Sequence, residues 1–276
     1  MIKADKYYKE NLREILENGS VDKDPRPRYK DGTPAYTKFI TQVFEKYDIS
    51  KGEFPITTLR NTAIKTGIKE IFWIYQHQSN SLEQARNLGI NWWDEWDIGD
   101  DTIGHRYGYT VSKYNLMNEI LDGLKSNPFG RRHIMNLYQN SDLKSSKGLY
   151  PCAYETIWSV REENGEYLID LTLNQRSNDY IVAGYINKTQ YVALMLMVCS
   201  HTGYKPGVFC HFVQNLHIYD RHFTAVNEIL GRERQSDFGH IKLDINKNFY
   251  DIEINDFEIH NPQSKRKLKS ELELAI

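Results

Sequence analysis

Two strands, a helix and a third strand follow one another in the second half of the chain, and this order constrains the fold most strongly. Residues 154–160 and 167–173 are strand-like, and Glu163-Asn164-Gly165-Glu166 between them is typical of a tight hairpin turn. Apolar residues at helical spacing follow and stop near Gly203, after which residues 208–218 are again extended. The alternation predicts an α/β fold.

The rest of the chain fits the same fold class. We predict a strand at 37–47 and further helices at 5–18, 61–76, 112–126 and 221–234. With 276 residues, of which 40% are hydrophobic, the chain is long enough to bury a full core. It contains no internal repeat, low-complexity segment or linker, so we expect a single domain over residues 1–276.

Composition and motifs exclude several classes of function. The net charge of −2 gives no general surface for nucleic acid or an anionic membrane, and no apolar run is long enough to span a bilayer. No Gly-rich phosphate loop or dinucleotide-binding fingerprint occurs. The N-terminus lacks an apolar signal core and the three cysteines are far apart, so we expect a reducing cytoplasmic compartment. Cys199, His201, Cys210 and His211 lack the paired spacing of metal ligands, so no metal is expected.

One cysteine has arginines on both sides of it in the sequence. Arg131 and Arg132 precede Cys152, and Arg176 follows it in the run Gln175-Arg176-Ser177-Asn178-Asp179. A guanidinium near a thiol favours the thiolate, which is the nucleophilic form, and arginines also bind phosphate. A lone cysteine is more often buried and inert. Brought into one site, these groups would join a nucleophile to a bound phosphate.

The order of these groups along the chain resembles thymidylate synthase. The matching segments are Phe54-Pro55-Ile56-Thr57-Thr58, Lys69-Glu70-Ile71-Phe72-Trp73, Trp93-Asp94-Glu95-Trp96, Gly104-His105-Arg106-Tyr107-Gly108, Arg131-Arg132-His133-Ile134, Pro151-Cys152, Gln175-Arg176-Ser177-Asn178-Asp179, Asn187, His217-Ile218-Tyr219 and Leu274-Ala275-Ile276. They cover nearly the whole chain and are far more specific than one short motif. The resemblance implies a large mixed twisted sheet with flanking helices, and sheet packing across a homodimer.

The resemblance also implies a reaction, the reductive methylation of dUMP by 5,10-methylenetetrahydrofolate to give dTMP and dihydrofolate. Cys152 would be the thiolate that adds to C6 of uracil and so turns C5 into a nucleophile. Arg176 would lower the pKa of this thiol and bind the phosphate of dUMP. Arg26, or else Arg28, would assist from the early loop, and Arg131 and Arg132 would come from the partner subunit.

Several further residues receive substrate-binding roles by the same resemblance. Asn187 would read the base, because its amide can accept from N3–H and donate to O4 of uracil. His217 and Tyr219 would bind the 3′-hydroxyl of the deoxyribose. Ser177 is expected near the phosphate and Asp179 near the pterin of the folate.

A second group is assigned to proton transfer and to the folate. Glu70 would organise water and move protons, and Tyr107 would help the proton leave C5. Trp93 and Trp96 would form walls of the folate pocket. The C-terminal segment with Ala275 would contact the folate, and the carboxylate of its last residue would close over the ligands.

Some positions depart from the family pattern. Ala153 stands where histidine commonly follows the nucleophile, and Leu59 stands where lysine usually follows Thr-Thr. Residues 182–186 replace a segment that usually carries Gly and Pro-Phe, and this segment borders the folate. Near the C-terminus we expect Lys265-Arg266-Lys267 to be a solvated charge run, with binding of a folate polyglutamate tail as the alternative.

The residues leave other functions open. A dUMP or dCMP hydroxymethylase would share the fold but add water instead of hydride. Asn187 favours uracil, because a carboxylic side chain would suit cytosine better. A cysteine hydrolase would pair Cys152 with His217 and leave the arginines unexplained. A non-catalytic nucleotide-binding protein would bind dUMP without a covalent adduct.

Overall fold

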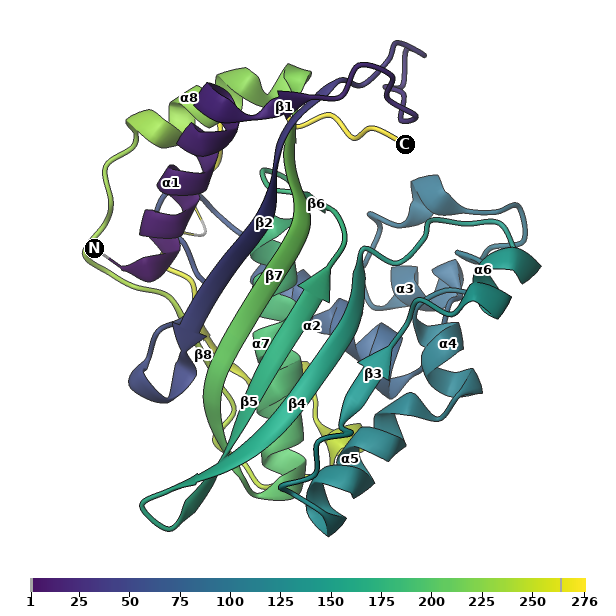
Figure 1. Cartoon of the computed structure of the whole chain (residues 1–276), viewed down its shortest axis with the longest axis vertical. Helices are drawn as coiled ribbons and strands as arrows, with labels where there is room; N and C mark the ends of the chain where they lie inside the picture. Colours follow the sequence, from purple (N-terminus) through teal and green to yellow (C-terminus); the bar gives the residue numbers. More distant parts are fainter. Residues whose placement is uncertain (1, 264) are drawn as a thin grey trace.

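A mixed β-sheet forms the centre of the computed structural model, which describes residues 2–263 and 265–276 (Figure 1). Within these residues the sheet has seven strands: β1 (Ser20–Val21), β2 (Thr37–Asp48), β3 (Ile134–Asn136), β4 (Ala153–Glu163), β5 (Glu166–Gln175), β6 (Asn178–Asp179) and β7 (Lys205–Tyr219). The strand order is β1-β2-β7-β5-β4-β3, and β6 also pairs with β7. β7 runs parallel to β5 and β6, and the other pairs are antiparallel. The predicted large mixed sheet is therefore confirmed.

β4 and β5 form the predicted hairpin. Asn164 and Gly165 make its two-residue turn with φ angles of 56° and 81°, the left-handed values that Asn-Gly adopts readily. At the other end of the hairpin the register shifts between Ala153 and Glu155. Such an irregularity bends a strand and re-aims the neighbouring side chains. Here it lies directly beside Cys152.

The helix α7 (Gly184–Thr202) lies behind the sheet and is the most buried helix of the fold (Figure 1). It ends at Gly203, whose φ of 77° is the left-handed value common after a helix. Because the parallel strands β5 and β7 need a crossover connection, α7 supplies it and packs against the inner face of both strands. The helix α2 (Ile64–Ile71) packs beside it.

The helix predicted over 61–76 is shorter and less regular than expected. Only α2 is α-helical, and Phe72–Gln76 continues it as the π-helical turn η2. The residues before α2 do not join the helix, because the backbone N–H of Asn61 donates to the carbonyl of Arg266 in the C-terminal tail. A π-turn widens the helix and shifts the side chains that follow.

The helix predicted over 112–126 is two helices. These are α4 (Gly108–Lys113) and α5 (Leu116–Ser126). Asn115 between them has a φ of 52°, and this left-handed conformation breaks a right-handed helix. The apolar residues on the two sides of the break keep the same helical spacing, so the sequence pattern predicted one continuous helix.

The other predicted elements are present with adjusted ends. The helix expected at 221–234 begins as the 3-10 turn η4 (Asp220–His222) and continues as α8 (Phe223–Gly231). The remaining helices and strands are α1 (Lys3–Asn18), α3 (Leu82–Asn87), α6 (Asn140–Ser145), β8 (His240–Lys242) and β9 (Glu258–His260). Short 3-10 turns are η1 (Ile49–Lys51), η3 (Asp94–Trp96), η5 (Phe249–Asp251) and η6 (Ile254–Asp256). No helix in the described part of the chain is long and apolar enough to cross a membrane.

The two faces of the sheet differ in what covers them. The inner face packs on α7 and α1, whereas the opposite face carries no helix within the described residues (Figure 1). Apolar side chains stand on this open face: Phe44 is 53% exposed and Ile134 is 49% exposed, and Ile157 and Phe212 are half-buried. We call these four residues the outer sheet patch.

Candidate active site

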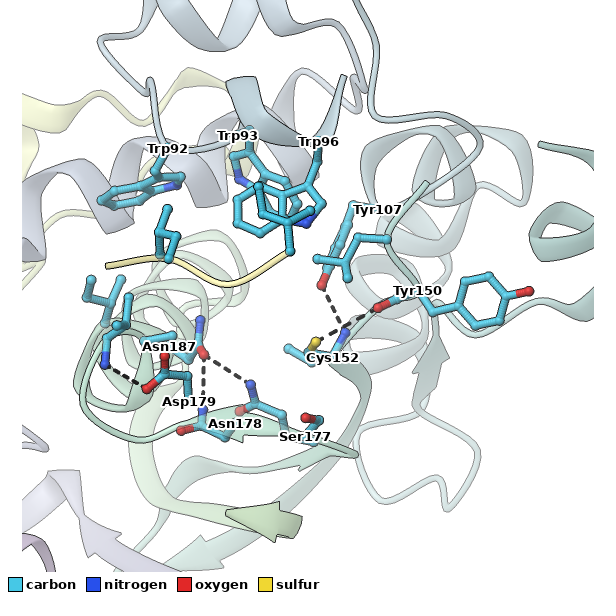
Figure 2. A pocket seen from close by; sticks show the side chains of 18 of the residues that line it. Trp92, Trp93, Trp96, Tyr107, Tyr150, Cys152, Ser177, Asn178, Asp179 and Asn187 are labelled. Atoms are coloured by element: carbon cyan, nitrogen blue, oxygen red, sulfur yellow. Dashed lines mark hydrogen bonds between the residues drawn. The ribbon is translucent and has the colours of Figure 1, made fainter. Parts of the chain in front are cut away.

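A cavity of about 940 Å³ opens beside Cys152, where segments from both ends of the chain meet. It brings together all the site residues predicted from the sequence except Arg131 and Arg132. Those that line it are Arg26, Glu70, Trp93, Trp96, Tyr107, Cys152, Arg176, Ser177, Asp179, Asn187, His217, Tyr219 and Ala275. Figure 2 shows the tryptophans on one side of this cavity, with Cys152 and Asn187 across from them.

Cys152 is half-buried and lies at the bend before β4. Its Sγ lies 3.6 Å from Nη2 of Arg176 and 3.8 Å from the carbonyl oxygen of Tyr150. Its backbone N–H donates to the hydroxyl of Tyr107 at 3.0 Å (Figure 2). No imidazole in the described residues hydrogen-bonds to this sulfur. The geometry therefore gives no support to a cysteine–histidine hydrolase.

The electrostatics of Cys152 differ from the prediction. Burial raises the pKa of its thiol, and the positive charges of Arg176 and Arg26 lower that pKa by less than burial raises it. The expected lowering of the pKa is therefore wrong. The sequence showed the arginines but not the loss of water around the sulfur, which disfavours the charged form.

Arg176 is fixed to the loop that carries the cysteine. Its Nε donates to the carbonyl of Pro151 at 3.0 Å, and its Nη2 donates to the carbonyl of Tyr150 at 2.6 Å. The backbone N–H of Arg176 also donates to the carbonyl of Cys152 at 3.0 Å. The guanidinium and the sulfur are thus held as one unit across the β4–β5 pair.

The early loop places one of its two candidate arginines at the cavity. Arg26 is exposed and lines it. Arg28 does not line it, and its Nη1 donates to the carbonyl of Pro25 at 2.9 Å. Of the two, Arg26 is the one placed to meet a ligand.

Arg131 and Arg132 are exposed and lie outside the cavity, next to β3. Within one chain they contribute nothing to the pocket around Cys152. This is the placement expected of residues that would act in a partner subunit, and it leaves that role a prediction.

Glu70 is buried in α2, with 7% of its surface exposed. Its Oε2 accepts a hydrogen bond from the indole N–H of Trp92 at 2.5 Å. Burial raises the pKa of the carboxyl to about 7, although the bond from Trp92 opposes the rise. A carboxyl with a pKa near neutral can take up and release a proton during a reaction.

The raised pKa of Glu70 predicts a pH-dependent stability effect. In the unfolded chain the carboxyl ionises near its ordinary value of 4.5, while the folded protein keeps the proton until about pH 7. The free energy of unfolding should therefore fall between these values and stay low above them. Glu70→Gln should be more stable than the wild type at pH 8, by roughly 3 kcal/mol, and about equal to it at pH 4.5. Urea denaturation at both pH values measures this.

The exposed Glu95 provides the matched control. Glu95→Gln should leave the free energy of unfolding unchanged at both pH values. If Glu70→Gln shifted stability by the same amount at pH 4.5 and pH 8, the burial of an ionising carboxyl would not be the cause.

Tyr107 lies between Cys152 and the two tryptophans Trp93 and Trp96. It has a φ of 48°, an unfavourable value for a residue with a side chain, and such strain is often found at functional sites. Its ring packs edge-on to Trp93 with centroids 5.4 Å apart, and Trp93 packs edge-on to Trp96 at 5.5 Å. Burial and the nearby Cys152 raise the pKa of its hydroxyl well above the usual range.

Asn187 lies in the first turns of α7, and both polar atoms of its side-chain amide hydrogen-bond to other side-chain amides. Its Oδ1 accepts from Nε2 of Gln175 at 3.0 Å and from Nδ2 of Asn178 at 3.1 Å (Figure 2). Its Nδ2 donates to Oε1 of Gln190 at 2.9 Å. The orientation of the amide is thereby fixed before any ligand binds.

His217 and Tyr219 stand side by side at the end of β7. Nδ1 of His217 lies 3.1 Å from Oδ1 of Asn215, so the ring donates there and its Nε2 is left as an acceptor. Burial lowers the pKa of His217 and raises that of Tyr219 to about 12, so both groups are neutral near pH 7. Asp179 lies nearby, and its Oδ1 accepts from the backbone N–H groups of Ile181 and Val182.

The C-terminal segment already lies against the early loop. Ile276 and Arg28 exchange both backbone hydrogen bonds, at 3.0 and 2.8 Å. Arg221 joins the two segments from η4, with ion pairs of 2.7 Å to Asp31 of the loop and to Glu273 of the tail. The last three residues line the cavity from this position.

Trp92 and Gln190 are among the residues of the site that had no role in the sequence-based prediction. Trp92 holds Glu70, and Gln190 holds Asn187. Gln190 follows Asn187 by three residues on a helix, so the shared face was a signal that could have identified it. Trp92 gave no comparable signal, because its neighbour Trp93 fits the same aromatic segment equally well.

The departures from the family pattern now have locations. Ala153 is buried at the start of β4, and Leu59 is fully buried. Arg60 beside it donates to the carbonyl of Ile181, next to the segment expected to border the folate. In the C-terminal basic run the two lysines are exposed as predicted, but Arg266 is half-buried and donates to the carbonyls of residues 58 and 233.

Comparisons with known proteins agree on one family. A family model described as thymidylate synthase matches residues 6–274. The chain is 47% identical over 278 residues to a thymidylate synthase of Streptococcus sanguinis (strain SK36), covering 99% of each chain. It is 48% identical over 263 residues to that of Lactococcus lactis subsp. lactis (strain IL1403), covering 94% of each. Among solved structures, the thermostable thymidylate synthase A from Bacillus subtilis matches with a TM-score of 0.88 and 33% identity, covering 99% of both chains.

Proposed function

The chain belongs to the thymidylate synthase family, a family of methyltransferases, and we propose that its pocket performs the reductive methylation of dUMP. The products are dTMP and dihydrofolate, so the enzyme serves dTMP biosynthesis. The observation that carries the assignment of residues is the 3.6 Å contact between Sγ of Cys152 and the guanidinium of Arg176, in a cavity that also holds Asn187 and Glu70. The family relationship favours this activity over a hydroxymethylase and over a non-catalytic nucleotide-binding protein.

Cys152 is proposed as the nucleophile that adds to C6 of uracil. A thiol whose pKa is raised by burial gives a strongly nucleophilic thiolate once the proton is lost. The charge on Arg176 stabilises that thiolate while it exists. Addition to C6 turns the sulfur into a neutral thioether, so the cost of the buried charge ends when the bond forms.

Recognition of the base is assigned to Asn187. Because its Oδ1 faces two amide donors, its Nδ2 is the group we expect to donate to O4 of uracil. Cytosine carries an amino group at that position, which would meet another donor. The donor side of this amide supports uracil as the base.

The phosphate and the sugar are assigned to groups around the cysteine. Arg176, Arg26 and Ser177 would bind the phosphate, together with Arg131 and Arg132 of the partner subunit. His217 and Tyr219 would bind the 3′-hydroxyl: Nε2 of the neutral imidazole can accept from it and the phenol can donate to it.

The opposite side of the cavity fits a folate. Trp93 and Trp96 offer aromatic surface for a flat heterocycle, and Asp179 and Ala275 also line the cavity. The co-substrate 5,10-methylenetetrahydrofolate supplies the one-carbon unit and then the hydride when it is bound. Glu70 would relay protons to and from water at the base, and Tyr107 would help remove the proton at C5. The C-terminal carboxylate would close the cavity and exclude water.

A homodimer is part of the proposal. The outer sheet patch leaves apolar side chains without a cover in one chain, and a second sheet packed on it would bury them. The exposed Arg131 and Arg132 would then reach the partner's phosphate site. We further propose that residues 1–276 fold as a single domain, which the family match over residues 6–274 supports, and that the enzyme acts in the cytoplasm.

Product analysis tests the proposed reaction directly. Purified protein incubated with dUMP and 5,10-methylenetetrahydrofolate should release dihydrofolate, which is followed by absorbance, and a nucleotide heavier by one methylene unit. A product carrying a hydroxymethyl group, or no dihydrofolate, would contradict the proposal. Incubation with dCMP in place of dUMP is the control and should give no product.

A further inference from the structure

A buried histidine lies behind the residue proposed to read the base. His211 is on β7 with 1% of its surface exposed, and it does not line the cavity. Its Nε2 lies 2.7 Å from Oε1 of Gln175 on the neighbouring strand. Gln175 in turn donates from Nε2 to Oδ1 of Asn187 at 3.0 Å. The three side chains form a continuous hydrogen-bonded relay from the inside of the sheet to the base-binding amide.

The direction of every bond in this relay is determined by its neighbours. Because Gln175 uses its amide nitrogen on Asn187, its oxygen must accept from His211, so the imidazole carries its proton on Nε2. Nδ1 of His211 has no partner in the described residues. A buried ring nitrogen without a proton loses less free energy when it lacks a hydrogen-bond partner than a buried N–H does. This difference favours the same tautomer.

Burial keeps the histidine neutral, and a buried ion pair lies beside it. Glu45 lies directly opposite His211 across the β2–β7 ladder and accepts from Nζ of Lys188 at 2.7 and 2.9 Å. Both partners of the pair are essentially inaccessible, with 2% and 0% of the side chain exposed. Burial and the charge of Lys188 lower the pKa of His211 to about 3, although the opposite charge of Glu45 works against this shift. Lys188 also follows Asn187 directly on α7, so the same pair anchors the backbone of the base-reading residue.

We propose that His211 is a positioning residue for base recognition: by donating from Nε2 to Gln175 it fixes the amide orientation of Asn187 and so favours uracil over cytosine. The inference rests on the proposed role of Asn187. Reversal of the Asn187 amide would present an acceptor to the amino group of cytosine and a donor to its N3. The relay makes that reversal costly, since the three side-chain hydrogen bonds of the Asn187 amide and the histidine tautomer would have to change with it.

Two substitutions of His211 separate hydrogen bonding from packing. His211→Phe keeps a ring but removes the donor, whereas His211→Gln can place an amide N–H at the position of Nε2. The readout is the inhibition constant of dCMP divided by the KM of dUMP. This ratio should fall about 10-fold in His211→Phe and stay within about threefold of the wild type in His211→Gln. The KM of the folate should not change in either variant. Equal ratios in the two variants would overturn the proposal.

A double-variant cycle tests whether the effect passes through Gln175. Gln175→Leu should lower the ratio by itself, and adding His211→Phe should lower it no further. If the two substitutions each lowered the ratio by a separate factor and the factors multiplied, His211 would act through general packing. Asn187→Ala separates this proposal from the one it rests on. Loss of discrimination in Asn187→Ala without any loss in His211→Phe would overturn the relay alone. Unchanged discrimination in Asn187→Ala would overturn base reading by Asn187 and the relay with it.

The unmodified enzyme provides a test that needs no folded variant. In protein labelled with ¹⁵N at histidine, the ring of His211 should show a protonated Nε2 and an unprotonated Nδ1 at pH 7. Its signals are assigned by their contacts with Gln175. A proton on Nδ1, or a charged ring, would contradict the relay.

Discussion

Replacing Cys152 with serine should slow the methylation of dUMP by about 10⁴-fold or more, because a hydroxyl does not ionise near neutral pH and adds to C6 far more slowly than a thiolate. Serine has nearly the same size, and the loop keeps two hydrogen bonds of the backbone of residue 152: its N–H donates to the hydroxyl of Tyr107, and its carbonyl accepts from the N–H of Arg176. The measurement is kcat with saturating dUMP and folate. Mass spectrometry after incubation with 5-fluoro-dUMP and 5,10-methylenetetrahydrofolate should show a covalent adduct in the wild type and none in the variant.

Cys210 offers the matched control, since it is half-buried on β7, away from the cavity. Cys210→Ser should keep wild-type activity and still form the adduct on Cys152. Full activity of the Cys152→Ser variant, or an adduct located on another residue, would rule out the proposed nucleophile. A folded variant that binds dUMP but neither reacts nor forms the adduct is the expected outcome.

The sequence predicted the sheet well because its strands carry local signals. The hairpin turn at Asn164-Gly165 is decided by two residues that accept left-handed backbone angles, and the apolar run of α7 is read from spacing alone. The helix breaks were harder to predict. Asn115 breaks the helix although the apolar spacing is the same on both sides of it. Asn61 lies outside α2 because its backbone N–H donates to the C-terminal tail. Contacts between remote segments decide such ends, and periodicity does not contain them.

The candidate site shows the same division. Motifs identified Cys152, Arg176 and Asn187 because their chemistry requires specific residue types, and the fold brings them together around one cavity. The pKa of Cys152 went the other way from the prediction, since desolvation depends on everything packed around the sulfur. Trp92, which holds Glu70, could not be distinguished from its neighbours by sequence.

The arginines proposed to bind the phosphate fall into two groups, one inside the cavity of the chain and one on its surface. Arg176 and Arg26 reach the cavity within one chain, whereas Arg131 and Arg132 point to solvent beside β3, on the edge of the same sheet that carries the outer sheet patch. If two chains pack through that patch, one surface both buries apolar side chains and delivers charge to the neighbouring site. Each active site would then be complete only in the dimer.

Mixing two inactive variants should therefore restore activity. One is Cys152→Ser, and the other is the Arg131→Leu/Arg132→Leu double variant, which should lose phosphate binding in its partner's site. Random pairing makes about half of the dimers mixed, and each mixed dimer has one site with an intact cysteine and intact arginines, so activity should recover to about a quarter of the wild-type value. The assay is dihydrofolate release after the subunits have been allowed to exchange in mild denaturant and then diluted.

The recovery distinguishes shared sites from separate ones. If Arg131 and Arg132 served the pocket of their own chain, both sites of a mixed dimer would be damaged and activity would stay absent. The control mixes Cys152→Ser with Arg176→Leu, whose lesions lie in the same chain's cavity, and this mixture should stay inactive. Recovery in the first mixture alone requires that the arginines act across the interface, because only an exchange of residues between chains can turn two damaged sites into one complete site.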